Sequence, residues 1–83
     1  MATQEDIEEH RSVFNQALVV FGERDEVHKG LWKEMDMPEE DHLIQHKAKR
    51  WAHTRNEEDA IDLINYVAFS IQNQRRRNAV DPG

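Results

Sequence analysis

The sequence contains no cysteine and no long hydrophobic run. Without cysteine, the chain cannot form disulfides or bind zinc through thiolates. No apolar run approaches the roughly 20 residues that span a membrane. The N-terminus is acidic, whereas a secretory signal is first basic and then apolar. These absences exclude a disulfide scaffold and a membrane-spanning protein, and they favour a cytoplasmic location.

Basic residues are in the minority, with 11 Lys and Arg against 17 Asp and Glu, which gives a net charge of −6. General duplex-DNA binding draws its affinity from phosphate neutralisation, so this balance argues against that class of protein. The basic residues are nevertheless grouped, at positions 47–50 and 75–77. A local anion site therefore remains open.

The small size of the chain limits its core. Its 83 residues form one small domain. A domain of this size buries only a little more than about 60% of the surface of its unfolded chain. Association with further copies is the usual way for such a chain to bury more area. We therefore predict a homo-oligomer, either a dimer or a dimer of dimers.

Helical periodicity begins near the N-terminus and predicts a helix over residues 4–21. Thr3 and Asp6 provide a variant capping box at its start, and Gly22 is the expected stop. Residues 22–37 are predicted to form an irregular connector that contains a short helical turn. The first helix carries one wide apolar stripe, made of Ile7, Phe14, Ala17, Leu18 and Phe21.

Two further helices are predicted after the connector. The second covers residues 38–54, and acids at 39–41 complement its dipole. The third covers residues 57–77, with Asn56 as its cap and Asp59 at the position of a capping-box acid.

The link between the second and third helices is so short that they must form an antiparallel hairpin. The first helix packs across this hairpin, and no strand pattern of any length is present. The predicted fold class is therefore all-α: a helical hairpin plus an N-terminal helix, completed by oligomerisation. Residues 1–77 form the single domain, and residues 78–83 form a flexible tail.

One lysine interrupts the apolar face of the second helix. Lys47 falls between Leu43 and Trp51, and Arg50 lies at the edge of the same face. Such a lysine either extends its ammonium group to solvent or meets a buried acid or a ligand anion. Both alternatives stay open at this point.

The third helix carries a polar face beside its aliphatic one. Asp59 and Asp62 are three residues apart, Tyr66 continues their row, and Asn65 flanks it. Two carboxylates at this spacing can ligate one hard cation such as Mg²⁺. The alternative is one capping acid and one surface acid. The aromatic ring on this face favours a ligand, because an exposed apolar surface needs cover.

Most of the chain resembles the nucleotide modification-associated domain, a phage-rich relative of the MazG-like all-α nucleotide pyrophosphohydrolases. The most specific part is D-x-x-D-x-x-N-Y on the third helix, preceded by K-x-x-R on the second. The resemblance implies an oligomer of helical hairpins that acts on nucleotides or holds them. Active family members cleave a nucleoside triphosphate between its α- and β-phosphates, with Mg²⁺ held by E-x-x-E and E-x-x-D pairs. The segments that carry the resemblance are RDEVHKGLW (24–32), HKAKRW (46–51) and DAIDLINYVAF (59–69).

Carried over residue by residue, the family's pattern fits only in part. Asp59 and Asp62 match the E-x-x-D pair and would hold Mg²⁺. The second helix has no E-x-x-E, and Lys47 and Arg50 occupy the face where those acids are expected. Three outcomes stay open: a one-metal pyrophosphohydrolase, a binding protein without turnover, and a structural ion-pair cluster.

The resulting functional prediction is a phosphate-bearing nucleotide bound between the second and third helices, near the connector. Tyr66 and Trp32 would stack on the base, and Lys29 would close over the phosphates. Two alternatives are kept: non-catalytic sequestration of a nucleotide signal, as a phage would use against host defence in the host cytoplasm, and a helical protein–protein interaction module. The predicted nucleotide-binding residues are Lys29, Trp32, Lys47, Arg50, Asn65 and Tyr66.

Overall fold

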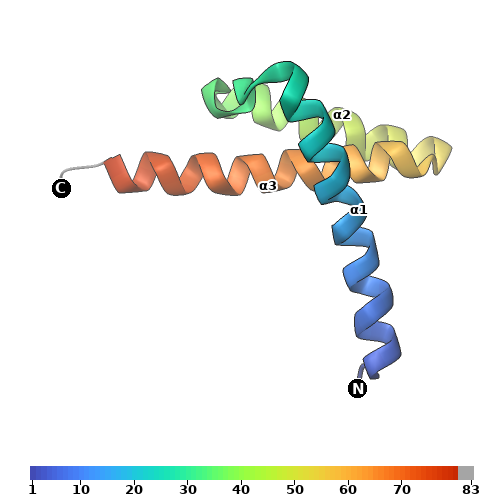
Figure 1. The fold of residues 1–83 in the computed structure, drawn as a ribbon. Coiled ribbons are helices and arrows are strands. Elements are labelled where there is room, and N and C mark those ends of the chain that lie inside the picture. The colour runs from blue at the N-terminus through green and yellow to red at the C-terminus, as the bar shows by residue number, and fades with distance from the viewer. Residues whose placement is uncertain (81–83) are drawn as a thin grey trace.

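The chain folds into three long α-helices and one short 3₁₀ helix (Figure 1). The computed structural model describes residues 1–80, and no strand occurs among them. The all-α prediction is therefore confirmed for this part of the chain. In chain order the elements are α1 (Gln4–His28), η1 (Leu31–Glu34), α2 (Met37–Thr54) and α3 (Glu57–Val80).

The predicted hairpin is present, since α2 and α3 run antiparallel and α1 crosses α3 (Figure 1). Arg55 turns the chain with a φ of 56°, and the side chain of Asn56 accepts a hydrogen bond from the Glu58 N–H (3.0 Å). The Asn56 cap is thus confirmed. The capping-box role of Asp59 is wrong, because the Asn56 N–H donates instead to the hydroxyl of Thr54 (3.2 Å). The carboxylate of Asp59 is left to turn toward α2.

Side-chain capping fixes the start of α1 where the sequence predicts it. The Thr3 hydroxyl accepts from the Asp6 N–H (3.1 Å), and the Asp6 carboxylate accepts from the Thr3 N–H (2.9 Å). These hydrogen bonds, the backbone one above all, hold the pKa of Asp6 below its ordinary value. The capping box is therefore confirmed.

The predicted stop of the first helix at Gly22 is wrong, because α1 continues to His28. A glycine within a helix costs only about 0.5–1 kcal/mol relative to alanine, which a long helix tolerates. The chain leaves the helix where two successive residues adopt left-handed backbone, Lys29 (φ 50°) and Gly30 (φ 74°). The Asp25 carboxylate accepts the Gly30 N–H (2.9 Å) and fixes this turn.

The connector between α1 and α2 is shorter than predicted, but it holds the expected helical turn, which is η1. The second helix starts at Met37, one residue before the predicted start. The Asp36 carboxylate caps it by accepting the Glu39 N–H (2.9 Å). The third helix passes the predicted end at Arg77 and continues to Val80. The remaining residues of the predicted tail, 81–83, lie outside the described residues.

The interior of the protomer is mainly polar. Ala17 and Ile61 are the only buried apolar side chains within residues 1–79. Most of the predicted α1 stripe stays open, since Phe14 is 48% and Leu18 63% exposed. The helices are therefore joined as much by polar contacts as by apolar packing. The buried polar side chains are Glu40, Asp59, Asp62, Asn65 and Asn73.

None of the helices in residues 1–80 combines the length and the apolar character that crossing a membrane requires.

Candidate functional site

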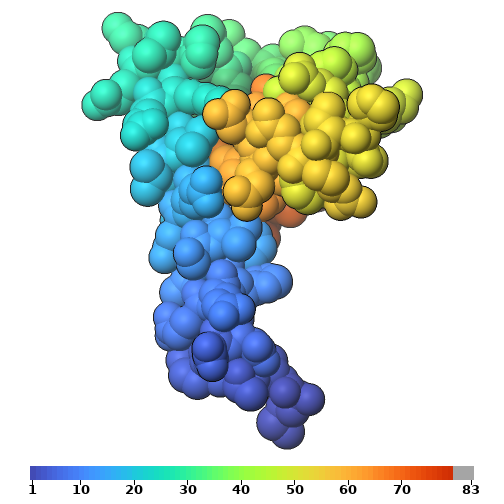
Figure 2. Space-filling view, turned by 90° about the vertical axis from the view of Figure 1, so that its right-hand side faces the viewer, coloured from blue at the N-terminus to red at the C-terminus, as the bar shows by residue number. Residues whose placement is uncertain are grey.

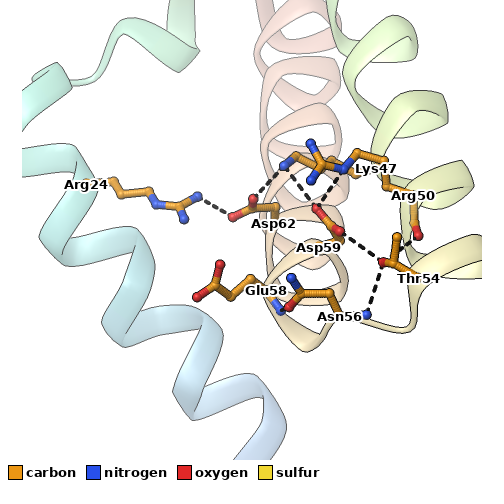
Figure 3. Close-up of polar contacts among 8 residues, drawn as sticks. All are labelled: Arg24, Lys47, Arg50, Thr54, Asn56, Glu58, Asp59 and Asp62. Carbon is orange, nitrogen blue, oxygen red and sulfur yellow. Dashed lines mark hydrogen bonds and ion pairs between the residues drawn. The ribbon is translucent and has the colours of Figure 1, made fainter.

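Five charged side chains from all three long helices meet at one place, here named the ion-pair cluster: Arg24, Lys47, Arg50, Asp59 and Asp62 (Figure 3). Lys47 Nζ lies 3.3 Å from Asp59 Oδ1 and 2.9 Å from Asp62 Oδ2. Arg50 Nε lies 3.4 Å from Asp59 Oδ1. Arg24 pairs with Asp62 Oδ1. Of the two alternatives left open for Lys47, the structure shows the buried acid.

The two acids of this cluster are buried, and two of its three cations are half exposed to solvent. The side chains of Asp59 and Asp62 are only 4% and 8% exposed, whereas those of Arg24 and Arg50 are 52% and 51% exposed. The hydrogen bond to Asp62 is the main cause that raises the pKa of Lys47; burial opposes it, and Asp59 adds to it. Lys47 is therefore a stable ammonium group. Three cations against two carboxylates leave the cluster with one excess positive charge.

The two acids were predicted to hold Mg²⁺, but their surroundings do not fit the ion. Each of their four carboxylate oxygens already has a partner, because the hydroxyl of Thr54 lies 3.4 Å from Asp59 Oδ2 and cations hold the other three oxygens. Mg²⁺ requires a nearly ideal octahedron of oxygen ligands. Within residues 1–80 no group of three or more His, Asp or Glu side chains is arranged to hold a metal.

A pocket of about 480 Å³ opens beside the cluster, between α1, η1 and α3. The predicted position between the second and third helices is therefore wrong for this pocket, because Glu39 is the only α2 residue in its lining. Arg24 and Asp62 belong to both the cluster and the pocket, so the cluster borders the pocket and Arg24 is the one Lys or Arg side chain in the lining. Its lining combines four aromatic side chains, two aliphatic ones and a polar set: Phe21, Trp32, Tyr66 and Phe69; Leu31 and Met35; Arg24, Asp25, His28, Glu39, Asp62 and Asn65.

The aromatic wall of this pocket is held by ring contacts. Trp32 stacks on Phe69, with ring centroids 4.6 Å apart and 16° between the planes, and Arg76 lies 4.9 Å from the centroid of the same indole. Trp32 therefore serves as a fixed wall, since groups of its own chain already lie against its ring. Tyr66 meets Phe69 only edge-on, at 6.1 Å, so its ring is the better stacking platform. Asn65 is anchored by donating to the Ala17 carbonyl (3.1 Å).

A second polar network fixes η1 against α3. Asn73 Nδ2 donates to Glu40 Oε2 (2.7 Å) and to the Trp32 carbonyl (3.0 Å). Arg77 Nη2 donates to the same Glu40 oxygen (2.9 Å) and to the Met35 carbonyl (3.2 Å). Burial alone would raise the pKa of Glu40, but the hydrogen bonds and charge of Arg77 and the Asn73 hydrogen bond outweigh it and lower the pKa. The network thus holds the segment that carries Trp32.

The structure brings most of the predicted site residues together. Trp32, Asn65 and Tyr66 line the pocket with Asp62. The cluster places Lys47, Arg50 and Asp59 next to Asp62, outside the pocket lining. Lys29 is not part of this arrangement, because it ends α1 as an exposed residue with left-handed backbone.

Sequence reasoning missed Arg24 and Glu40. Arg24 lies in the first segment of the resemblance, but its partner is 38 residues away and no periodic signal joins them. Glu40 was predicted only to complement the dipole of the second helix, whereas its side chain is buried, 2% exposed.

Comparisons with protein-family models, curated proteins and solved structures found no match to this chain. The resemblance to the nucleotide modification-associated domain therefore stays a prediction that rests on the three segments themselves.

Proposed function

We propose that this protein binds a phosphate-bearing nucleotide in the pocket beside the ion-pair cluster. The observation that carries the proposal is the position of Arg24, a half-exposed guanidinium at the edge of an aromatic-walled pocket. A volume of about 480 Å³ is within the usual range of roughly 300–1,000 Å³ for small-molecule sites. An aromatic wall suits a base, and a guanidinium suits a phosphate.

Each part of a nucleotide has a counterpart among the pocket residues. The base stacks on Tyr66, a contact worth about 1–3 kcal/mol in single-stranded nucleic-acid binders. Asn65 offers its remaining amide groups to the polar edge of the base or to the sugar. The phosphates meet Arg24, and the excess positive charge that Lys47 and Arg50 bring to the cluster favours their approach.

The cluster supports binding more than hydrolysis. Two-metal hydrolysis of phosphate bonds requires free carboxylates that clamp the metal ions, and here both acids are paired with cations. Of the open alternatives, we therefore favour a protein that holds a nucleotide with slow or no turnover. Such a protein would serve to sequester a nucleotide signal. A Mg²⁺-dependent pyrophosphohydrolase would first have to release these acids from their cationic partners.

Isothermal titration calorimetry tests the proposal. Nucleoside triphosphates, dinucleotides and cyclic nucleotides are titrated with Mg²⁺ and with chelator, and chromatography of the mixtures detects turnover. We expect one class to bind with a Kd below about 1 mM, which corresponds to roughly −4 kcal/mol. Absence of heat across the panel would contradict nucleotide binding and would favour the helical interaction module.

A matched pair of arginine variants on α1 locates the binding. Arg24→Gln removes the pocket guanidinium, and Arg11→Gln removes a guanidinium of similar exposure, 57% against 52%, from the same helix. We expect Arg24→Gln to weaken binding at least tenfold, about 1.4 kcal/mol, and Arg11→Gln to leave it unchanged. Equal affinities of the two variants would place the ligand elsewhere.

Self-association is the second part of the proposal, as a homodimer or a dimer of dimers. It is supported by the small apolar interior of the protomer, where Ala17 and Ile61 alone are fully buried among the described residues. The large apolar side chains of α1 that remain open are of the kind that homodimer interfaces cover.

A further inference from the structure

An apolar surface lies open where α1 crosses α3, and it is here named the α1–α3 face. On α1 it consists of Ile7, Phe14 and Leu18, which are 43%, 48% and 63% exposed. Their spacing of seven and four residues places them on one side of the helix. On α3 it consists of Ile64, Val67 and Ile71. A groove of about 350 Å³ runs between the two helices, lined by Phe14, Leu63, Ile64, Val67, Ala68 and Ile71.

The first half of α1 projects from the rest of the protomer. In Figures 1 and 2 this segment stands clear of α2 and α3 as an arm. The radius of gyration is 14.7 Å, against roughly 12 Å for a compact domain of this length. A lone helix of fewer than about 12–15 residues is marginal in water. The arm therefore needs a surface to pack against, and α2 and α3 of its own chain supply none within residues 1–80.

The accessible area shows how large the missing contact is. The protomer exposes 6566 Å², whereas a folded monomer of its mass exposes only roughly 5,200 Å². The excess is on the order of 1,000 Å² per protomer. A standard interface buries about 800 Å² per partner, and obligate homodimers bury more. The open area thus matches what one stable dimer contact requires.

We propose that the occupant of the α1–α3 face is a second copy of this chain, related by a two-fold axis, so that the arm of each protomer lies along α3 of the other. This inference specifies the interface of the self-association proposed above. The face is self-complementary in the way that such a contact demands, because it offers both an apolar ridge on α1 and an apolar groove beside α3.

The charges on α1 and α3 also favour a second copy of this chain as the partner. The arm carries four acids, Glu5, Asp6, Glu8 and Glu9, against one arginine, Arg11, which pairs with Glu8. The row Ile64, Ala68, Ile71 on α3 continues at the same spacing to Arg75, which makes no ion pair within residues 1–80. An arm that lies along the partner's α3 brings acidic residues toward this arginine. A second copy therefore supplies the apolar surface and the opposite charge at once.

The contact leaves the nucleotide pocket open. Asn65, Tyr66 and Phe69 line the pocket, and Ile64, Val67 and Ile71 line the groove. On a helix these two sets point to different sides of α3. Dimerisation and nucleotide binding are therefore separate properties, and an interface variant should keep its affinity for nucleotide.

Neighbouring residues on α1 provide a matched test. Leu18 is 63% and Val19 60% exposed, but only Leu18 lies in line with Ile7 and Phe14. Sedimentation equilibrium is measured at micromolar concentration for the wild type, Leu18→Glu and Val19→Glu, with Ile71→Glu as an independent change on α3. We expect the wild type and Val19→Glu to have twice the 9.8 kDa mass of one chain, and Leu18→Glu and Ile71→Glu to dissociate.

The outcomes separate this inference from the broader proposals. A monomeric wild type overturns self-association and the face together, and the calorimetric test of the pocket is independent of both. If the wild type is a dimer and both Leu18→Glu and Ile71→Glu remain folded dimers, the α1–α3 face is not the interface, although self-association stands. If these two variants lose their helical circular dichroism signal, they are unfolded and do not test the interface. The inference is then tested by the Tm of the wild type. It must rise with protein concentration over about a hundredfold range, and a constant Tm contradicts the inference.

Discussion

Arg24 and Asp62, which are 38 residues apart in the sequence, form an ion pair that joins α1 to α3 at the edge of the pocket. They are the two members of the ion-pair cluster that also line the pocket. A phosphate bound as we propose would therefore share the guanidinium of Arg24 with Asp62 or compete with Asp62 for it. In the proposed complex, Asp62 would be an internal substitute for the negative charge of the phosphate.

This competition predicts opposite effects for the two partners of one ion pair. Asp62→Asn should raise the affinity for a nucleoside triphosphate several-fold, because it frees Arg24 and removes a nearby negative charge worth about 1 kcal/mol. Arg24→Gln should lower the affinity. Calorimetry with chelator present measures both. A loss of affinity in Asp62→Asn, with Mg²⁺ required for binding, would instead show that Asp62 is a metal ligand.

Lys47 should stabilise the fold. Lys47→Met leaves two buried carboxylates with fewer cations, and breaking a buried ion pair costs about 3–5 kcal/mol. We expect a loss of about 3 kcal/mol in urea unfolding, at the lower end of that range, because Arg24 and Arg50 still face the acids. Lys49→Met, an exposed change on the same helix, is the control. Equal free energies of unfolding for the two variants would mean that the Lys47 pair contributes nothing.

Glu40 should make stability depend on pH in the acid range. Its pKa in the folded chain lies below the ordinary value of 4.5. Its contribution is therefore present above pH 4.5 and is lost as the pH falls through the lowered folded value. We expect Glu40→Gln to cost about 2 kcal/mol at neutral pH and progressively less below pH 4.5. Glu39→Gln is the exposed control, and a cost of Glu40→Gln that is constant with pH would refute the ion-pair explanation.

Several features that depend on residues close together in the sequence were predicted correctly. The hairpin, the caps at Thr3 and Asn56 and the three helices follow from spacing and capping chemistry. The position of Lys47 on an apolar face left solvent exposure and a buried acid as alternatives, and the structure shows the buried acid. Tyr66, on the polar face of α3, indicated a ligand site, because an exposed ring needs cover, but the predicted place of that site between α2 and α3 was wrong.

The failures are of two physical kinds. The stop at Gly22 was wrong because propensity is a weak term that the rest of a helix overrides. Arg24 and Glu40 were missed because contacts 38 and 33 residues apart leave no periodic trace in a single sequence. A polar core of this kind consists of side-chain contacts between different helices. These contacts depend on how the helices pack in three dimensions, which the spacing of residues within one helix does not show.

Mg²⁺ by itself should not stabilise the protein. The carboxylates of Asp59 and Asp62 are already paired with cations, and a ligand raises the Tm only by binding the folded state. We expect equal melting temperatures in millimolar Mg²⁺ and in a monovalent salt of the same ionic strength. A rise of several degrees that is specific to Mg²⁺ and disappears in Asp59→Asn would restore the metal-site prediction.

The most direct measurement uses the two tryptophans of the chain. Trp32 lines the pocket, whereas Trp51 lies on α2 beneath Arg55. Trp51→Phe therefore leaves a single reporter at the proposed site, and Trp32→Phe leaves one away from it. Titration of each variant with the calorimetric panel should change the emission of Trp32 saturably, with a Kd below about 1 mM, and leave Trp51 unaffected. An unchanged Trp32 emission across the panel, or equal changes at both tryptophans, would contradict nucleotide binding in this pocket.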